Sequence, residues 1–279
     1  MIPTRAFGPT GVEVPVLGQG TWKLRDGRSA ERAIRVGIEL GLTHIDTAEL
    51  YTGAESILAP VLRDHREQLF VVSKVLPKNG SKAGVARACE QSLKRLGTDH
   101  LDVYLLHWPS DDHPLAETIG ALEALVDAGK TRFIGVSNFE PGELEEARRL
   151  ASRHPIVCNQ VLYHLGERGI EHELIPACEK ARVAVVGYSP FGSGDFPPGG
   201  KRSRGALEAI AKKHGKTARQ VALNLLTRHR ATFSIPKAET EAHVRENAGA
   251  LGWSLEADDL AALDRAFPRP EANQPLGTI

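Results

Sequence analysis

The sequence contains little cysteine and no excess of either charge. Its three cysteines in 279 residues form no Cys-x-x-Cys pair, which argues against a disulfide framework or a zinc site and favours a reducing compartment. Lysines plus arginines and aspartates plus glutamates number 35 each, so a general affinity for nucleic acid or anionic membrane is not supported. No apolar run is long enough to cross a membrane, and the first residues lack an apolar signal core. We therefore expect a cytoplasmic protein without membrane or nucleic-acid partners.

The composition is that of a globular protein with a sizeable core, because 41% of the residues are hydrophobic and 25% are charged. The chain has no low-complexity tract, no linker and no break in composition. Although its length could accommodate two small domains, it also suits one α/β barrel. We expect a single domain over residues 1–279.

Short apolar strands alternate with amphipathic helices along almost the whole chain. A hairpin at residues 5–15, with its turn at Gly8-Pro-Thr-Gly11, comes first. The expected strands are 16–19, 43–46, 70–75, 101–107, 132–137, 156–160, 183–188 and 232–236. The expected helices are 29–40, 54–63, 81–96, 116–128, 141–152, 171–181, 204–228 with a break at Gly215, 240–249 and a further one at 255–265.

Eight strand–helix units in series favour an α/β fold of the closed (β/α)₈ TIM-barrel type, with an N-terminal β-hairpin and an extra C-terminal helix. A segment such as Val183-Ala-Val-Val-Gly187 is almost continuously apolar, as expected when both faces of a parallel sheet are covered. No Gly-x-Gly-x-x-Gly follows the first strand, which weighs against a Rossmann domain.

Polar residues stand at or just beyond the ends of most of these apolar strands. In TIM barrels the carboxyl ends of the strands carry the active site. A lysine inside an apolar strand costs several kcal/mol unless a counter-charge meets it, and Asp46 is the candidate partner of Lys74. The strand-end residues are Asp46, Lys74, His107, Asn138, Gln160, Tyr188 and Lys237.

Asp46, Lys74, Tyr51 and His107 together suit acid–base chemistry. Tyrosine normally has a pKa near 10, and a nearby ammonium lowers it by stabilising the phenolate. Asp46 would keep Lys74 charged, Lys74 would act on Tyr51, and His107 would orient a carbonyl or share the proton. Taken singly, each residue also has an ordinary structural role as a loop cap, a strand-end lysine, a packed aromatic or a core histidine. Convergence at one end of one sheet is what favours the catalytic interpretation.

The motifs that carry these residues resemble those of the aldo-keto reductases. They are Ile45-Asp-Thr-Ala-Glu-Leu-Tyr51, the strand ending at Lys74, Leu-Leu-His107-Trp, Ile134-Gly-Val-Ser-Asn-Phe139 and Gly187-Tyr-Ser-Pro190. The resemblance covers essentially the whole chain in order. It implies reduction of aldehydes or ketones with a nicotinamide cofactor and without metal. Tyr51 is then the general acid, Lys74 and Asp46 tune it, and His107 orients the substrate.

The resemblance also implies a set of cofactor contacts. Ser137, Asn138 and Gln160 match residues that bind the carboxamide, which suits them because a carboxamide both donates and accepts hydrogen bonds. Tyr188 matches the aromatic residue that stacks on the nicotinamide. Residues matching the pyrophosphate and adenosine sites are Ser189, Phe191, Gly192, Lys237, Ala238, His243, Glu246 and Asn247.

The adenosine-phosphate segment departs from the family pattern at two positions. Lys237 matches the partner of a ribose 2′-phosphate. However, Ala238 stands where a serine is frequent, and His243 stands where an arginine commonly holds the phosphate with a bidentate fork. NADPH is the expected cofactor, with NADH or dual use as an open alternative. Arg245 could compensate or could simply face solvent.

Trp22, Leu50 and Trp108 are the expected walls of the substrate pocket. The neighbouring loops are short, which suggests an open site that accepts carbonyl compounds of different shapes. One alternative is a metal-dependent barrel hydrolase that uses the oxygen- and nitrogen-rich set His44, Asp46, His107, Asp111, Asp112 and His113, although Lys74 would repel the metal. Another is a reductase-like barrel acting as a redox-sensing regulatory subunit. We expect a monomer.

Overall fold

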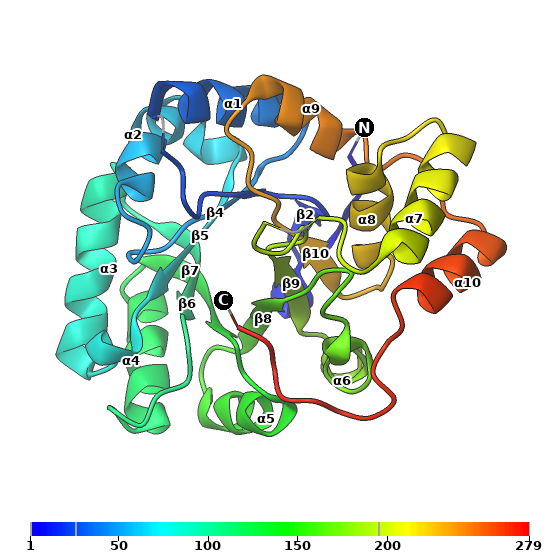
Figure 1. The fold of residues 1–279 in the computed structure, drawn as a ribbon. Coiled ribbons are helices and arrows are strands. Elements are labelled where there is room, and N and C mark those ends of the chain that lie inside the picture. Colours follow the sequence, from blue (N-terminus) through cyan, green and yellow to red (C-terminus); the bar gives the residue numbers. More distant parts are fainter. Residues whose placement is uncertain (1, 26, 195, 279) are drawn as a thin grey trace.

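The computed structural model describes residues 2–25, 27–194 and 196–278. Eight parallel strands form a curled sheet in the order β10-β9-β8-β7-β6-β5-β4-β3, surrounded by helices (Figure 1). The strands are β3 (Gln19–Gly20), β4 (His44–Asp46), β5 (Phe70–Val75), β6 (Leu101–Leu106), β7 (Thr131–Ser137), β8 (Ile156–Leu162), β9 (Ala184–Tyr188) and β10 (Thr232–Ser234). This is the (β/α)₈ barrel that the sequence predicted.

Hydrogen bonds between the first and last strands close the sheet into a ring. The Ser234 amide donates to the Val16 carbonyl, and the Gly18 amide donates to the Ser234 carbonyl, both at 2.9 Å. The regular strand β3 begins later than the predicted 16–19, because Leu17 pairs with Ser234 only through an isolated bridge. The predicted bounds of this strand were therefore wrong, although its place in the barrel was right.

The helices lie outside the ring, and most begin within a few residues of their predicted starts. They are α1 (Gly27–Glu39), α2 (Ala54–His65), α3 (Lys82–Leu96), α4 (Leu115–Asp127), α5 (Pro141–Leu150), α6 (Leu174–Ala181), α7 (Lys201–Lys213), α8 (Ala218–Leu226), α9 (Glu241–Ala248) and α10 (Ala257–Ala266). The helix predicted over 204–228 is two helices, with Gly215 at φ +61° between them, where a residue without Cβ is favoured. The predicted 171–181 helix is a 3₁₀ turn, Gly169–Glu171, followed by α6.

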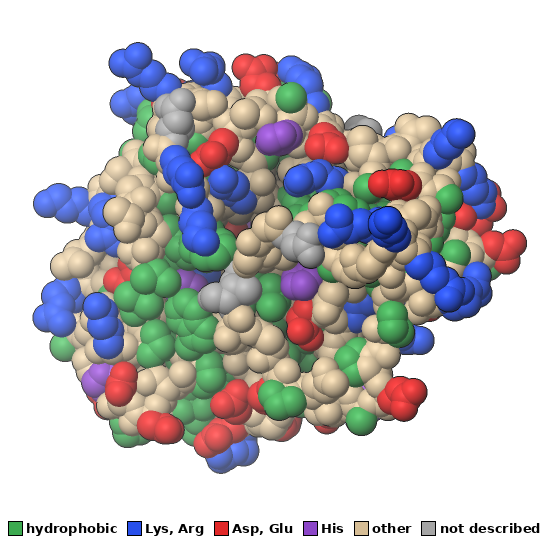
Figure 2. Space-filling view, in the orientation of Figure 1, with side chains coloured by type: hydrophobic (Ala, Val, Ile, Leu, Met, Phe, Trp, Pro, Cys, Tyr) green, Lys and Arg blue, Asp and Glu red, His purple; other side chains and the backbone are tan. Residues whose placement is uncertain are grey.

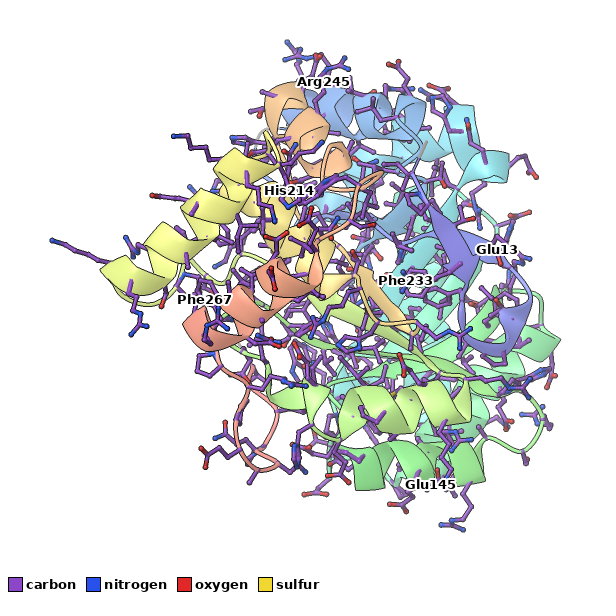
Figure 3. All side chains as sticks on the ribbon, turned by 90° about the vertical axis from the view of Figure 1, so that its right-hand side faces the viewer. Glu13, Glu145, His214, Phe233, Arg245 and Phe267 are labelled. Atoms are coloured by element: carbon purple, nitrogen blue, oxygen red, sulfur yellow. The ribbon has the colours of Figure 1, made fainter. Side chains whose placement is uncertain are left out.

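A hairpin closes the amino end of the barrel. Strands β1 (Thr4–Ala6) and β2 (Glu13–Pro15) pair antiparallel, and Phe7 beyond β1 is fully buried. The Phe7 ring packs at 4.8 Å from Phe70 and 5.0 Å from Phe233. In Figure 3, Phe233 lies in the interior of the molecule and Glu13 at its edge. This aromatic layer fills the barrel interior near the amino ends of the strands. A functional site is therefore expected at the opposite, carboxyl ends.

No helix in the described ranges combines the length and apolar character needed to cross a membrane. The apolar faces of the helices are used instead to cover the sheet. In α3, for example, Val85, Ala88, Cys89, Leu93 and Leu96 are buried, at the three- and four-residue spacing of a helix that packs one side on a core.

Candidate active site

Asp46 and Lys74 form a buried ion pair at the carboxyl end of the barrel. They lie on the neighbouring parallel strands β4 and β5, and the Lys74 side chain has no exposed surface. Its Nζ donates to Asp46 Oδ1 at 2.7 Å and to the Thr47 carbonyl at 2.8 Å. Burial acts to lower the pKa of Lys74, but Asp46 and Tyr51 together outweigh burial, and the pKa is raised. Lys74 is therefore held as a cation, as a buried lysine requires.

Tyr51 follows β4 in the loop before α2 and reaches the same ammonium. Lys74 Nζ lies 3.4 Å from Tyr51 Oη and 4.8 Å from the ring centroid. Burial raises the pKa of Tyr51, and this effect outweighs the lowering by Lys74. The lowered pKa predicted from the sequence is therefore wrong, because desolvation of the phenolate acts against the nearby ammonium. At neutral pH the hydroxyl is protonated and can donate a proton.

His107 follows β6 and faces Tyr51. The two rings meet edge to face with centroids 5.8 Å apart, and Trp108 stacks on His107 at 3.8 Å. Burial, assisted by the positive charge of Lys74, lowers the pKa of His107 to about 2. The imidazole is consequently neutral, so one ring nitrogen can donate a hydrogen bond to a carbonyl oxygen near Tyr51 without adding a second cation.

Gln160, on β8, links Asp46 to Ser137 on β7. Its Nε2 donates to Asp46 Oδ2 at 2.7 Å, so the two carboxylate oxygens of Asp46 have different partners. Ser137 Oγ donates to the Gln160 carbonyl at 2.8 Å. The sequence placed Gln160 among cofactor contacts but did not predict its bond to Asp46, because 114 residues separate the two in the chain.

Asn138 lies just beyond β7 in a left-handed conformation, with φ +63°, which is uncommon for a residue other than glycine and marks a constrained position. Its Nδ2 donates to the His107 carbonyl at 3.0 Å. Its Oδ1 accepts a hydrogen bond from the Tyr188 hydroxyl at 2.9 Å. This hydrogen bond holds the Tyr188 hydroxyl in place and fixes the orientation of the ring.

These side chains surround a pocket of about 190 Å³. Its walls include the three expected residues Trp22, Leu50 and Trp108, and Leu50 is 44% exposed at its rim. Figure 2 shows hydrophobic side chains gathered on this face of the molecule, over β6 and β7. The remaining lining residues are Gly20, Thr21, Asp46, Tyr51, His107, Asn138, Gln160, Tyr188, Ser189, Ile235 and Lys237.

Three lining residues were not predicted from the sequence: Gly20, Thr21 and Ile235. Gly20 is the informative one, since a Cβ there would lie 2.6 Å from the Ile235 carbonyl oxygen. Its position at the end of β3, two residues before Trp22, is the signal that could have identified it. Thr21 donates to the Asp46 carbonyl at 2.9 Å and supports the end of β4.

Several expected residues lie outside the pocket wall. Lys74 and Ser137 are buried behind it. Phe191 and Gly192 are on the loop after β9, where the Arg219 guanidinium lies 4.8 Å from the Phe191 ring. In the segment after β10, Ala238 is partly buried, His243 is exposed, Glu246 is partly buried and Asn247 is buried.

With this fold and site, the chain is an aldo-keto reductase: residues 16–267 match the model of the aldo/keto reductase family, to which the chain belongs. It is 42% identical to methylglyoxal reductase YeaE of Escherichia coli, covering 96% of both chains. It is 35% identical to glyoxal reductase of Bacillus subtilis, covering 94% of both. A crystal structure of an aldo/keto reductase from Klebsiella pneumoniae, in complex with NADP and acetate, superposes with a TM-score of 0.92 at 39% identity, covering 100% of each chain.

Family membership favours a reductase over the metal-dependent hydrolase. Across the described parts of the chain, no three histidine, cysteine, aspartate or glutamate side chains lie together in a way that could hold a metal ion. His44 is one of the residues considered as a metal ligand. Its ring packs against Phe7 and Phe70 and does not line the pocket.

Proposed function

We propose that this protein reduces small aldehydes and ketones with NADPH, and that methylglyoxal and related 2-oxoaldehydes are among its substrates. The observation that carries the proposal is the buried Asp46–Lys74 pair with Tyr51 Oη 3.4 Å from the ammonium. Asp46 and Tyr51 line a pocket of about 190 Å³, and Lys74 lies buried behind them. Such a volume suits a short carbonyl compound beside a bound nicotinamide. The similarity to the methylglyoxal and glyoxal reductases supports the substrate class.

The residues at the strand ends fit a nicotinamide nucleotide. Ser137, Asn138 and Gln160 provide hydroxyl and amide groups for a carboxamide, and Tyr188 provides a fixed aromatic face. Lys237 lines the same pocket and offers a cation to a phosphate. When bound there, the cofactor supplies the hydride for the carbonyl carbon.

In the proposed mechanism Tyr51 is the general acid. Its hydroxyl donates a proton to the carbonyl oxygen, and the resulting phenolate is stabilised by the Lys74 ammonium, which Asp46 keeps charged. Neutral His107 donates a hydrogen bond to the same oxygen and so orients the carbonyl. Trp22, Leu50 and Trp108 exclude water from one side of the substrate. The remaining cofactor contacts proposed are Ser189, Phe191, Gly192, Ala238, His243, Glu246 and Asn247.

The test is consumption of NADPH by the purified protein in the presence of methylglyoxal, glyoxal and a bulky aromatic aldehyde. We expect turnover with the 2-oxoaldehydes, and with all three if the short loops leave the pocket permissive. Absence of turnover with every carbonyl, in a protein whose tryptophan fluorescence responds to NADPH, would refute the proposed activity. Turnover restricted to one compound would refute only the permissive pocket.

We also propose a cytoplasmic monomer. The three cysteines are all buried and unpaired, as is usual in a reducing compartment. In the described part of the chain, Leu50 is the exposed large hydrophobic residue, and it belongs to the pocket rim rather than to an apolar surface suited to a second copy. Light scattering at micromolar concentration would test this, and a dimer mass would contradict it.

A further inference from the structure

Lys237 already has a carboxylate partner within its own loop. It follows β10 by three residues, and its Nζ lies 3.2 Å from Glu239 Oε2. Both side chains are about one-third exposed, at 36% and 27%. The cation proposed to receive a ribose 2′-phosphate is thus neutralised before any nucleotide arrives.

Glu239 is held in this place by the loop that leads from β3 into α1 and by the first turn of α1. The Arg25 amide donates to Glu239 Oε1 at 2.7 Å, and Ser29 Oγ donates to the Glu239 carbonyl at 2.7 Å. One carboxylate oxygen therefore binds a backbone N–H while the other faces the ammonium. This arrangement fixes the carboxylate beside Lys237 and limits its freedom to swing away when a second anion approaches.

Positions 238 and 243, which follow Lys237 in the chain, add little positive charge beside Glu239. Ala238 has no side-chain donor, and His243 lies exposed on the first turn of α9, where it has no fork of charged donors for a phosphate. Figure 3 shows Arg245 at the outer side of α9, directed away from the barrel. A phosphate carrying roughly two negative charges would meet the Glu239 carboxylate at the same ammonium.

We propose that Glu239 sets cofactor preference by disfavouring the 2′-phosphate, so that the enzyme discriminates less strongly between NADPH and NADH than Lys237 alone would allow. This inference rests on the proposed function, in particular on Lys237 as the phosphate partner. A 2′-hydroxyl is uncharged and can donate a hydrogen bond to the carboxylate, so NADH does not meet the same repulsion.

The experiment is to measure the dissociation constants of NADPH and NADH for the parent protein and for Glu239→Gln. Quenching of tryptophan fluorescence is a suitable signal because Trp22 and Trp108 line the pocket. Glutamine keeps an oxygen that can accept the Arg25 N–H and removes only the charge. Glu241→Gln, two residues along on α9, is the matched control for a general change in loop charge.

In Glu239→Gln, NADPH affinity should rise by about fivefold at low salt, which is the upper range for a partly exposed charge pair. NADH affinity should stay within twofold or fall, and the gain in the NADPH-to-NADH ratio should shrink as salt screens the charges. Glu241→Gln should leave the ratio unchanged.

An unchanged ratio in Glu239→Gln, with the parent still binding a nucleotide, would overturn this inference and leave the proposed function standing. An equal shift in Glu241→Gln would overturn it as well, because the effect would then be one of overall charge. Failure of the parent to bind either nucleotide would overturn the proposed function and this inference together.

Discussion

His44 is expected to make the protein sensitive to mild acid. The residue is fully buried at the start of β4, and its ring faces Phe7, Phe70 and Phe233 at 5.7, 5.7 and 6.4 Å. In the described part of the chain, neither ring nitrogen has a hydrogen-bond partner. Burial, assisted by the charge of Lys74, lowers the pKa of His44 to about 3. The folded protein therefore holds this imidazole neutral far below the pH at which the unfolded chain protonates it.

The size and sign of the effect follow from linkage. The unfolded histidine has a pKa of about 6.5, so below that pH the unfolded state binds more protons and stability falls as pH falls. Between pH 7 and pH 5 the loss from one such histidine is about 2 kcal/mol, and the full loss down to about pH 3 approaches 5 kcal/mol. His107, with its pKa lowered to about 2, adds a loss of the same size over the upper part of this range.

The test compares the free energies of unfolding of the parent and of His44→Leu at pH 7 and pH 5. Unfolding in urea is monitored by circular dichroism and tryptophan fluorescence. Whatever the substitution does to stability at pH 7, it should reduce the loss on going to pH 5 by about 2 kcal/mol, because the contribution of His44 is then removed. The contributions of the other histidines whose pKa burial lowers, His107, His164 and His229, stay the same in parent and variant. An identical loss in parent and variant would refute the assignment of a neutral buried His44.

Two further predictions concern buried ion pairs. Lys74→Met should lower stability by about 3–5 kcal/mol, because Asp46 would remain buried without its partner, and should also abolish most turnover; stability within 1 kcal/mol of the parent would contradict this. Arg168, which is buried and donates to Glu171 at 2.7 and 2.8 Å, lies outside the pocket. Arg168→Met should destabilise the protein by about 1–3 kcal/mol, less than Lys74→Met, because Glu171 keeps its ion pair with Arg228. The kcat should stay unchanged, and a large fall in kcat at a temperature where the variant is folded would contradict a purely structural role for Arg168.

The barrel could be predicted because its strands are apolar on both faces and end abruptly in polar residues. Lys74 was the most informative of these, since a lysine in a buried strand requires a nearby anion. The exception, β3, shows the limit of that signal. Residues 16–18 are apolar enough for a strand, but their pairing with the last strand is limited to the isolated bridge of Leu17 with Ser234. A local pattern cannot reveal which neighbour a residue will meet.

The contacts that link the site could not be predicted, because they join residues distant in the chain. The bond from Gln160 to Asp46 and that from Tyr188 to Asn138 depend on the order of strands around the ring. The raised pKa of Tyr51 was missed for a related reason: burial depends on packing from many segments, whereas the sequence shows only the candidate charge. The contact of Glu239 with Lys237 could not be predicted from the sequence either, because Glu239 is one acidic residue in a polar loop.

The central claim is that Tyr51 donates the proton during carbonyl reduction, and Tyr51→Phe tests it most directly. The Lys74 ammonium would keep its bond to Asp46 at 2.7 Å, so the variant should fold and bind NADPH with nearly the parent dissociation constant. Single-turnover oxidation of bound NADPH by methylglyoxal should be slower by about 10²–10⁴-fold, the usual contribution of a general acid. Oxidation at the parent rate, with cofactor binding intact, would contradict the account.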